Sequence, residues 1–167
     1  VEDPIAHGVS ALIAAGTTGE PSTMTWEEHL SVIRRVVEKA DHRVPVIAGT
    51  GSNATREAVY AAKHAKEFGA DAQLVVTPYY NKGTQKGLIT HFTTVADTSE
   101  VPVILYNVPS RTGVNLLPKT VAELAKHPNI VAIKEASGNM AQLVELMALC
   151  GDKIDVYSGE DALTVPM

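Results

Sequence analysis

The chain has 167 residues, of which 45% are hydrophobic and 20% charged, and its net charge is −5. This composition is typical of one folded globular domain and argues against a disordered chain or a nucleic-acid-binding protein. No apolar run reaches the roughly 20 residues of a membrane span, and the single cysteine, Cys150, cannot build a disulfide framework. We therefore expect a cytoplasmic protein without nucleic-acid or membrane partners.

Six short apolar runs recur along the chain, and none of them alternates with polar residues. This pattern is typical of parallel strands that are buried on both faces. The runs cover residues 11–15, 44–48, 73–77, 101–106, 130–133 and 154–157.

An amphipathic segment follows each of the first five runs and predicts a helix. Thr25 with Glu28 forms a capping box at the first helix start, Gly69 marks the end of the second helix, and Pro118 opens the fourth. The predicted helices begin after Thr25 and then cover about 55–68, 88–96, 118–125 and 140–147.

Strands that alternate with helices in this way form either an open doubly wound sheet or a (β/α)₈ barrel. A barrel needs eight strands, and the chain starts at Val1 and stops soon after residues 158–161, which resemble the start of a new helix. We expect residues 1–167 to be a single incomplete (β/α)₈ TIM-barrel domain with about six βα units, taken from a longer chain. Alone, it would be poorly stable or inactive, because two sheet edges stay open.

The polar motifs of the chain follow the ends of the predicted strands. In parallel α/β folds these carboxyl ends face one side, so segments far apart in the sequence can meet in one pocket. The motifs are residues 16–20, 77–81, 106–113, 134–138 and 158–161.

Lys134 directly follows the apolar run 130–133, which predicts a partly desolvated amine. Desolvation lowers the pKa of an amine, and a neutral amine can attack a ketone to form a Schiff base. An ion pair with Glu135 or Glu160 is the alternative interpretation. Tyr106 ends the preceding strand, where its phenol can either exchange protons during imine formation or pack in the core.

Two further motifs fit the binding of carboxylates. The turn at residues 16–19 offers the hydroxyls of Thr17 and Thr18 and backbone N–H groups to a small anion, although a plain strand-to-helix turn has the same sequence. The guanidinium of Arg111 suits bidentate carboxylate binding or, alternatively, a surface salt bridge.

Residues 49–54 match the G-x-G-x-x-A dinucleotide pattern, but the next strand ends in residues 77–79 without the required carboxylate. The six histidines show no metal-ligand spacing, and we interpret most of them as solvent-facing. Cys150 is interpreted as a packed apolar residue.

Taken together, these motifs resemble the dihydrodipicolinate synthase family of the pyruvate-dependent, Schiff-base class I aldolases. The resemblance spans about residues 11–161 and implies a (β/α)₈ barrel that needs neither a metal nor an organic cofactor. It rests on five motifs in order: GTTGE at 16–20, AGTG at 48–51, VTPYYN at 76–81, YNVPSRTG at 106–113 and IKEA at 133–136.

The resemblance implies four catalytic residues. Lys134 would form the imine with pyruvate, and Tyr106 would donate and accept the protons. Thr17 and Tyr80 would complete a proton relay, with Tyr80 supplied across a dimer interface.

The resemblance also implies the substrates and the assembly. Thr18 would hold the pyruvate carboxylate, and Arg111 would bind the carboxylate of L-aspartate 4-semialdehyde. The product would be 4-hydroxy-tetrahydrodipicolinate, an intermediate of lysine and diaminopimelate biosynthesis. The assembly would be a homotetramer built as a dimer of dimers.

Feedback inhibition by lysine is a further feature of the family. Pro21 and Trp26 replace a small polar residue and a histidine of lysine-sensitive members, so we expect weak inhibition at most. The other positions of that site are matched by His29, Asn53, Glu57 and Tyr79.

Two other functions stay open. A sister aldolase, such as a 2-keto-3-deoxy-sugar-acid aldolase or N-acetylneuraminate lyase, would keep the lysine and the Tyr-Asn-x-Pro piece. The sequence PSRTG at 109–113 and the paired tyrosines 79–80 favour the synthase, because they fit a short aldehyde with a carboxylate. The second possibility is a non-catalytic barrel that binds a keto acid without turnover.

Overall fold

The computed structural model describes all of residues 1–167, and its centre is one sheet of six parallel strands in sequential order. A doubly wound sheet reverses its strand order at a switch point, whereas a barrel keeps the chain order. The unbroken order therefore decides for the barrel. The strands are β1 (Leu12–Ala14), β2 (Val46–Gly49), β3 (Ala72–Val76), β4 (Val103–Asn107), β5 (Ile130–Glu135) and β6 (Asp155–Ser158).

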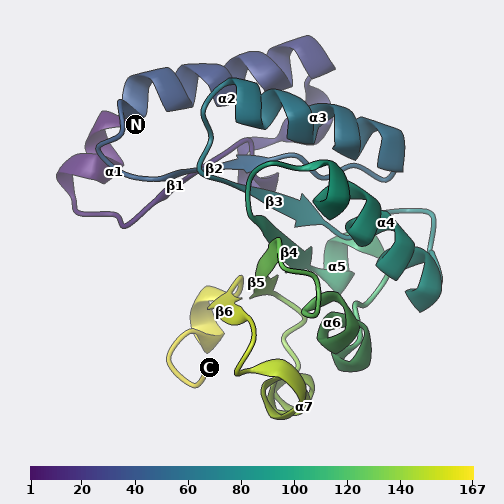
Figure 1. Cartoon of the computed structure of the whole chain (residues 1–167). Helices are drawn as coiled ribbons and strands as arrows, with labels where there is room; N and C mark the ends of the chain where they lie inside the picture. The colour runs from purple at the N-terminus through teal and green to yellow at the C-terminus, as the bar shows by residue number, and fades with distance from the viewer.

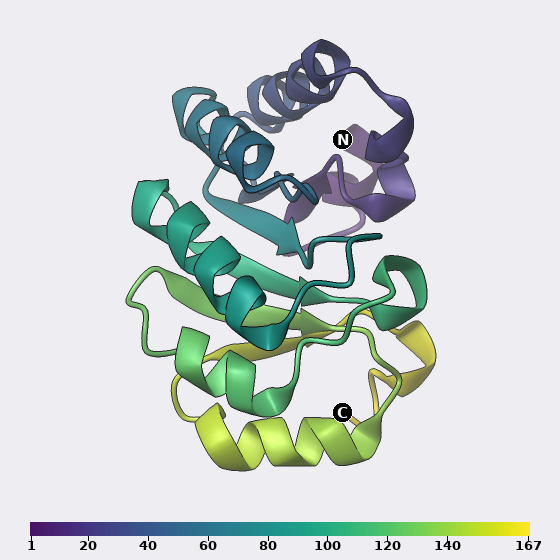
Figure 2. The same ribbon diagram turned by 90° about the vertical axis from the view of Figure 1, so that its right-hand side faces the viewer.

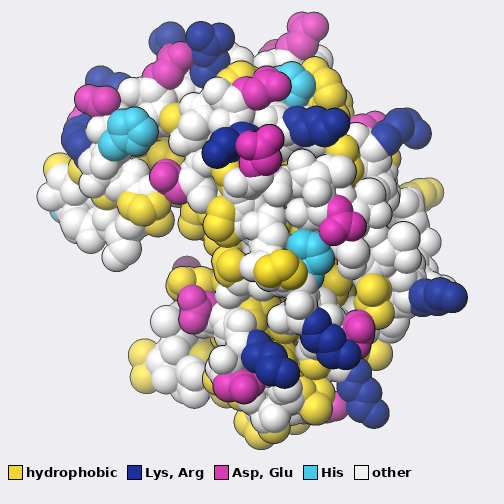
Figure 3. All heavy atoms as spheres, viewed as in Figure 1, with side chains coloured by type: hydrophobic (Ala, Val, Ile, Leu, Met, Phe, Trp, Pro, Cys, Tyr) yellow, Lys and Arg dark blue, Asp and Glu magenta, His cyan; other side chains and the backbone are white.

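The long helices lie along an arc outside the sheet, which curls into a half-barrel that is open between β1 and β6 (Figures 1 and 2). The space-filling view shows this open side as a notch (Figure 3). No helix combines the length and the apolar character that crossing a bilayer requires. The helices are α1 (Glu2–Ala6), α2 (Trp26–Ala40), α3 (Thr55–Glu67), α4 (Gln85–Thr98), α5 (Pro109–Thr112), α6 (Pro118–Leu124) and α7 (Met140–Cys150), with 3₁₀ turns at Thr17–Gly19, Pro21–Thr23 and Asp161–Leu163.

The six predicted strands and five predicted helices are all confirmed, with small shifts at their ends. The capping box of α2 is complete, because Thr25 Oγ1 accepts the Glu28 N–H while the Glu28 carboxylate accepts the Thr25 N–H at 2.8 Å. Gly69 follows α3 with a φ of +86°, the left-handed conformation that glycine adopts most easily.

Residues 158–161 do not begin an α-helix, contrary to our expectation. Ser158 still belongs to β6. Its hydroxyl forms two hydrogen bonds with the backbone of Glu160: it donates to the carbonyl oxygen at 2.7 Å and accepts from the N–H at 3.2 Å. Such local side-chain bonds compete with helix formation. Only the single turn Asp161–Leu163 follows. The short helices α1 and α5 were not predicted, because four or five residues carry no readable period.

The two faces of the sheet carry separate apolar clusters. Leu105 and Ile133 pack outward against helix residues such as Phe92 of α4. Ile104 and Ala132, one residue away along each strand, belong to a second cluster on the concave face. Because successive side chains of a strand point to opposite faces, Tyr106 lies on the concave face and Asn107 on the helix face.

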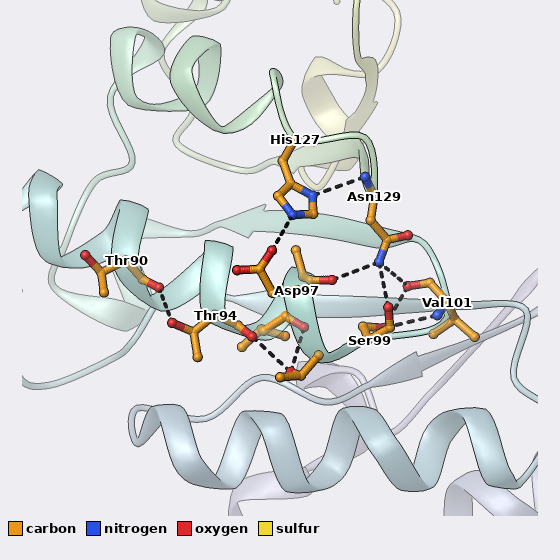
Figure 4. A network of polar contacts seen from close by, with 10 residues as sticks. Thr90, Thr94, Asp97, Ser99, Val101, His127 and Asn129 are labelled. Atoms are coloured by element: carbon orange, nitrogen blue, oxygen red, sulfur yellow. Dashed lines mark hydrogen bonds and ion pairs between the residues drawn. The ribbon is translucent and has the colours of Figure 1, made fainter.

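A polar network closes the amino-terminal edge of the sheet, at the turn between α4 and β4 (Figure 4). His127 Nε2 lies 3.0 Å from Asp97 Oδ1 at the end of α4. Asn129, just before β5, donates from Nδ2 at 3.1–3.2 Å to the carbonyls of Ala96, Ser99 and Val101. These contacts fix the edge of the sheet that lies opposite the polar motifs.

The glycines of the dinucleotide-like segment are explained by packing. A Cβ at Gly49 would lie 2.3 Å from the Ala15 carbonyl oxygen, and a Cβ at Gly51 would lie 2.5 Å from the Val76 nitrogen. Glycine therefore allows neighbouring strands to approach each other at these positions.

Two of the six histidines are exceptions to the expectation that most of them face solvent. His29 and His91 are buried, with 6% and 5% of their surface exposed. His29 Nε2 lies 2.7 Å from the Gly49 carbonyl oxygen, and His91 Nδ1 lies 2.9 Å from Thr55 Oγ1. Cys150 is buried as a free thiol, as predicted.

Candidate active site

Lys134 and Tyr106 lie side by side near the carboxyl ends of β5 and β4. They are register partners in the parallel ladder. The Lys134 Nζ lies 4.7 Å from the centroid of the Tyr106 ring, and this ring is buried in the concave-face cluster. The strand positions that the sequence indicated thus place an amine against a phenol ring.

Burial destabilises the charged form of Lys134 relative to a lysine in water. Burial lowers the pKa of its amine, and the carboxylate of Asp161 opposes this shift in part. The alternative ion pairs are not formed, since the salt bridges of the chain include none from Lys134 to Glu135 or Glu160. The amine is therefore available as a nucleophile once it is neutral.

Gly159 gives the Lys134 side chain its room. The Gly159 N–H donates to the Glu135 carbonyl at 2.8 Å, which holds this glycine beside β5. A Cβ there would lie 2.7 Å from the Ala136 Cβ and 3.1 Å from the Lys134 Cε. The φ of Gly159 is not in the left-handed region, so space rather than backbone conformation explains the glycine.

A cleft of about 810 Å³ brings together three other predicted site residues: Thr17, Tyr80 and Arg111. Tyr80 follows β3 and is 87% exposed, with a left-handed φ of 73°. Its N–H donates to the Thr112 carbonyl at 3.0 Å, which fixes the loop despite this strain. Lys82 also lines the cleft, so two cations, from Lys82 and Arg111, face this space.

The predicted site residues therefore form two groups. Lys134 and Tyr106 form the first group, and Thr17, Tyr80 and Arg111 of the cleft form the second. Thr18 belongs to neither group: it is exposed beside Thr17 in the 3₁₀ turn Thr17–Gly19 and does not line the cleft. No hydrogen bond links Thr17 or Tyr80 to Tyr106, so the proton relay stays a prediction.

Sequence reasoning missed three residues around this site. Lys82 adds a charge to the cleft, Gly159 makes room for the lysine, and Glu135 is a buried hydrogen-bond acceptor rather than an ion-pair partner. The burial of Glu135 could have been predicted from the alternation of side chains along β5. Because successive side chains point to opposite faces, the residue after an inward-facing lysine faces the helices.

No group of three or more His, Cys, Asp or Glu side chains in the chain could hold a metal ion. The fold and the site define a parallel (β/α)-barrel protein with a half-buried lysine and a neighbouring tyrosine at the carboxyl ends of adjacent strands.

The chain belongs to the Dihydrodipicolinate synthetase family, whose family model matches residues 1–167. It is 61% identical over 167 residues to the 4-hydroxy-tetrahydrodipicolinate synthase of Trichlorobacter lovleyi, and the match covers 100% of this chain and 58% of that relative. The chain thus spans somewhat more than half the length of this curated relative.

Solved structures give the same result. The dihydrodipicolinate synthase from Aquifex aeolicus superimposes with a TM-score of 0.96 at 50% identity, covering 99% of this chain and 57% of that one. The chloride-inhibited dihydrodipicolinate synthase from Acinetobacter baumannii, complexed with pyruvate, gives a TM-score of 0.95 at 50% identity, covering 98% and 56%. The six strands therefore form part of a TIM barrel.

Proposed function

We propose that the protein condenses pyruvate with L-aspartate 4-semialdehyde to give 4-hydroxy-tetrahydrodipicolinate, a step of lysine and diaminopimelate biosynthesis. The observation that carries this proposal is the Lys134 amine, whose pKa burial lowers, 4.7 Å from the centroid of the Tyr106 ring. The names of the relatives and the pyruvate complex of the Acinetobacter baumannii enzyme support the choice of substrates.

The chemistry begins with the neutral Lys134 amine. It attacks the ketone carbon of pyruvate, water leaves, and a protonated imine forms. This imine draws electrons, so a methyl proton of pyruvate departs and an enamine results. The enamine carbon attacks the aldehyde, and the amino group of the second substrate then displaces Lys134 as the ring closes.

Each of these steps moves a proton, and Tyr106, whose ring centroid lies 4.7 Å from the amine, would carry it. Thr17 and Tyr80 would extend the path toward solvent. Thr18 would hold the pyruvate carboxylate, and Arg111 would bind the carboxylate of the second substrate. Arg111 and Lys82 line the cleft together with the carboxylate of Glu57, so cations outnumber anions there, which supports an anionic ligand.

The assembly proposed is a homotetramer built as a dimer of dimers, acting in the cytoplasm, with residues 1–167 forming part of a single barrel domain. The exposure of Tyr80 supports a role at a neighbouring subunit, because 87% of its surface is free in this chain while hydrogen bonding holds its loop.

A paired assay of the purified full-length protein tests the proposal, because residues 1–167 span 58% of the curated relative. Condensation is measured with pyruvate and L-aspartate 4-semialdehyde, and cleavage is measured in parallel with 2-keto-3-deoxy-sugar acids and N-acetylneuraminate. We expect the wild-type protein to catalyse condensation and no sugar-acid cleavage. The Lys134→Arg variant should not catalyse condensation, because its guanidinium cannot be deprotonated. Sugar-acid cleavage without condensation would assign a sister aldolase and contradict the proposal.

A further inference from the structure

Glu135 is a buried carboxylate without a cation. It is 3% exposed and forms no ion pair, although it directly follows Lys134. Its two oxygens instead accept hydrogen bonds from the Asn107 Nδ2 at 3.1–3.2 Å, from the Ser137 N–H at 2.6 Å and from the Gln142 Nε2 at 3.4 Å. A carboxylate in such a place is costly unless its bonds are complete.

The network continues from Asn107 into the helix layer. Asn107 Nδ2 also donates to Asn115 Oδ1 at 2.9 Å, and Asn107 Oδ1 accepts the Leu116 N–H at 2.9 Å. Asn115 in turn donates to Gln142 Oε1 at 2.7 Å. Every polar side-chain atom of the network has a partner, since the buried atoms without one are Thr77 Oγ1 and His91 Nε2.

These bonds join the carboxyl ends of β4 and β5 directly behind the amine and the phenol. Asn107 and Glu135 are the register pair that follows Tyr106 and Lys134. Gln142 belongs to α7, so the same network ties both strand ends to a helix. The two pairs lie back to back, one on the concave face and the other on the helix face.

The pairing of β4 with β5 needs such a fixed point. Val103 pairs with Ile130 but Ile104 pairs with Ala132, so the register shifts and Val131 is an extra residue. A slip by one residue would send Lys134 to the opposite face of the sheet. The Asn107–Glu135 bonds lie beyond this irregularity and fix the register at the end where the lysine lies.

We propose that Asn107 and Glu135 are positioning residues, which hold the strand ends in register and thereby place the Lys134 amine against Tyr106. This inference rests on the proposed function, because positioning is measured through imine formation. A purely structural role would tolerate other solutions, since replacing both partners of a buried hydrogen bond by apolar groups of the same shape can be nearly neutral for stability.

The test compares four variants of the protein. Glu135→Gln keeps the shape but places an NH₂ group opposite a donor, either Asn107 Nδ2 or the Ser137 N–H. Asn107→Asp places two carboxylates face to face. The double variant Asn107→Asp/Glu135→Gln exchanges acceptor and donor between the two strands. Their hydrogen bond can form again when the side-chain amides of Asn115 and Gln142 turn over together, so that Asn115 donates to the new carboxylate and Gln142 accepts from the new amide.

The matched control is Gln73→Leu. Gln73 is a fully buried amide on β3 that accepts from Thr50 Oγ1 at 2.7 Å and donates to Ser99, the residue that also belongs to the network at the amino-terminal edge (Figure 4). Its loss removes a buried polar network of similar kind, away from the ends of β4 and β5.

The readouts are the rate of the borohydride-trapped pyruvate adduct per folded protein, its pH profile and the urea midpoint. We expect each single variant to trap about tenfold more slowly or worse, because small displacements of reacting groups cost large factors in rate. The double variant should recover most of the rate, and Gln73→Leu should keep the rate even where its urea midpoint falls.

Three results would overturn the inference: a Glu135→Gln rate within threefold of the wild type, a double variant no faster than the single ones, or an equal loss in Gln73→Leu. If Glu135→Gln does not fold, the double variant decides by the same criterion. Failure of the wild-type protein to form any adduct refutes the proposed function itself, and the positioning inference with it.

Discussion

The substitution Gly159→Ala tests most sharply how the lysine is placed. The new methyl carbon would lie 2.7 Å from the Ala136 Cβ, which is 0.7 Å inside the 3.4 Å where ordinary contacts begin, and 3.1 Å from the Lys134 Cε. The Ala136 Cβ moves only with its backbone, so the strain falls on β5 and on the lysine side chain. Overpacking of this kind costs about 1–3 kcal/mol of stability.

The effect on chemistry should exceed the effect on folding. A displacement of a reacting group by about 1 Å lowers rates by roughly 100-fold. We therefore expect Gly159→Ala to slow the borohydride-trapped pyruvate adduct by about 10- to 100-fold, while the urea midpoint falls modestly. Gly83→Ala is the control, because nothing lies within 4 Å of its added Cβ and its φ is not left-handed. A Gly159→Ala rate within twofold of the wild type would refute the steric argument.

Four further predictions follow from the same geometry. Tyr106→Phe should keep the fold but lower condensation by about 100-fold or more, because we propose the phenol as the proton carrier. An unchanged condensation rate in stopped-flow kinetics would contradict this role. The rate of adduct formation should rise with pH, with a midpoint below the pKa of an ordinary lysine, because burial lowers the pKa of Lys134. Asp161→Asn should lower this midpoint further, because the carboxylate of Asp161 raises the pKa of Lys134. Burial lowers the pKa of His91 from 6.5 to about 4, so between these pH values the unfolded chain binds a proton and the folded chain does not. The free energy of unfolding should therefore fall as the pH drops below 6.5, by up to about 3 kcal/mol near pH 4. His91→Gln should remove this part of the change in the urea midpoint. Lysine should inhibit weakly at most, because Trp26 replaces a histidine of lysine-sensitive members and its ring stacks on His29, another residue of the cleft, with centroids 5.1 Å apart. Submillimolar inhibition in the condensation assay would contradict this.

The order and type of the main elements could be predicted because each carries a local signal. The runs that become β3 and β4 are mostly apolar, and the capping box at Thr25 and the glycine at 69 mark helix ends through backbone chemistry that acts within a few residues. The choice between a barrel and a doubly wound sheet could not be made from these signals alone, since it depends on the spatial order of strands.

Long-range contacts explain most of what the sequence did not reveal. The burial of His91 depends on a contact with Thr55 of another helix, 36 residues away. The role of Glu135 depends on partners from β4 and α7. Lys134 and Tyr106 could be singled out because each ends an apolar strand, whereas the contact between them depends on a register that includes an irregularity at Val131.

The mass of the full-length protein after borohydride reduction with pyruvate tests the central claim most directly. Reduction of a pyruvate imine links the keto carbon covalently to the amine, so the intact mass should increase by one reduced pyruvyl group. Peptide mapping should place this group on Lys134, and Lys134→Arg should abolish it. An unchanged mass, or an adduct on any other lysine, would contradict the account.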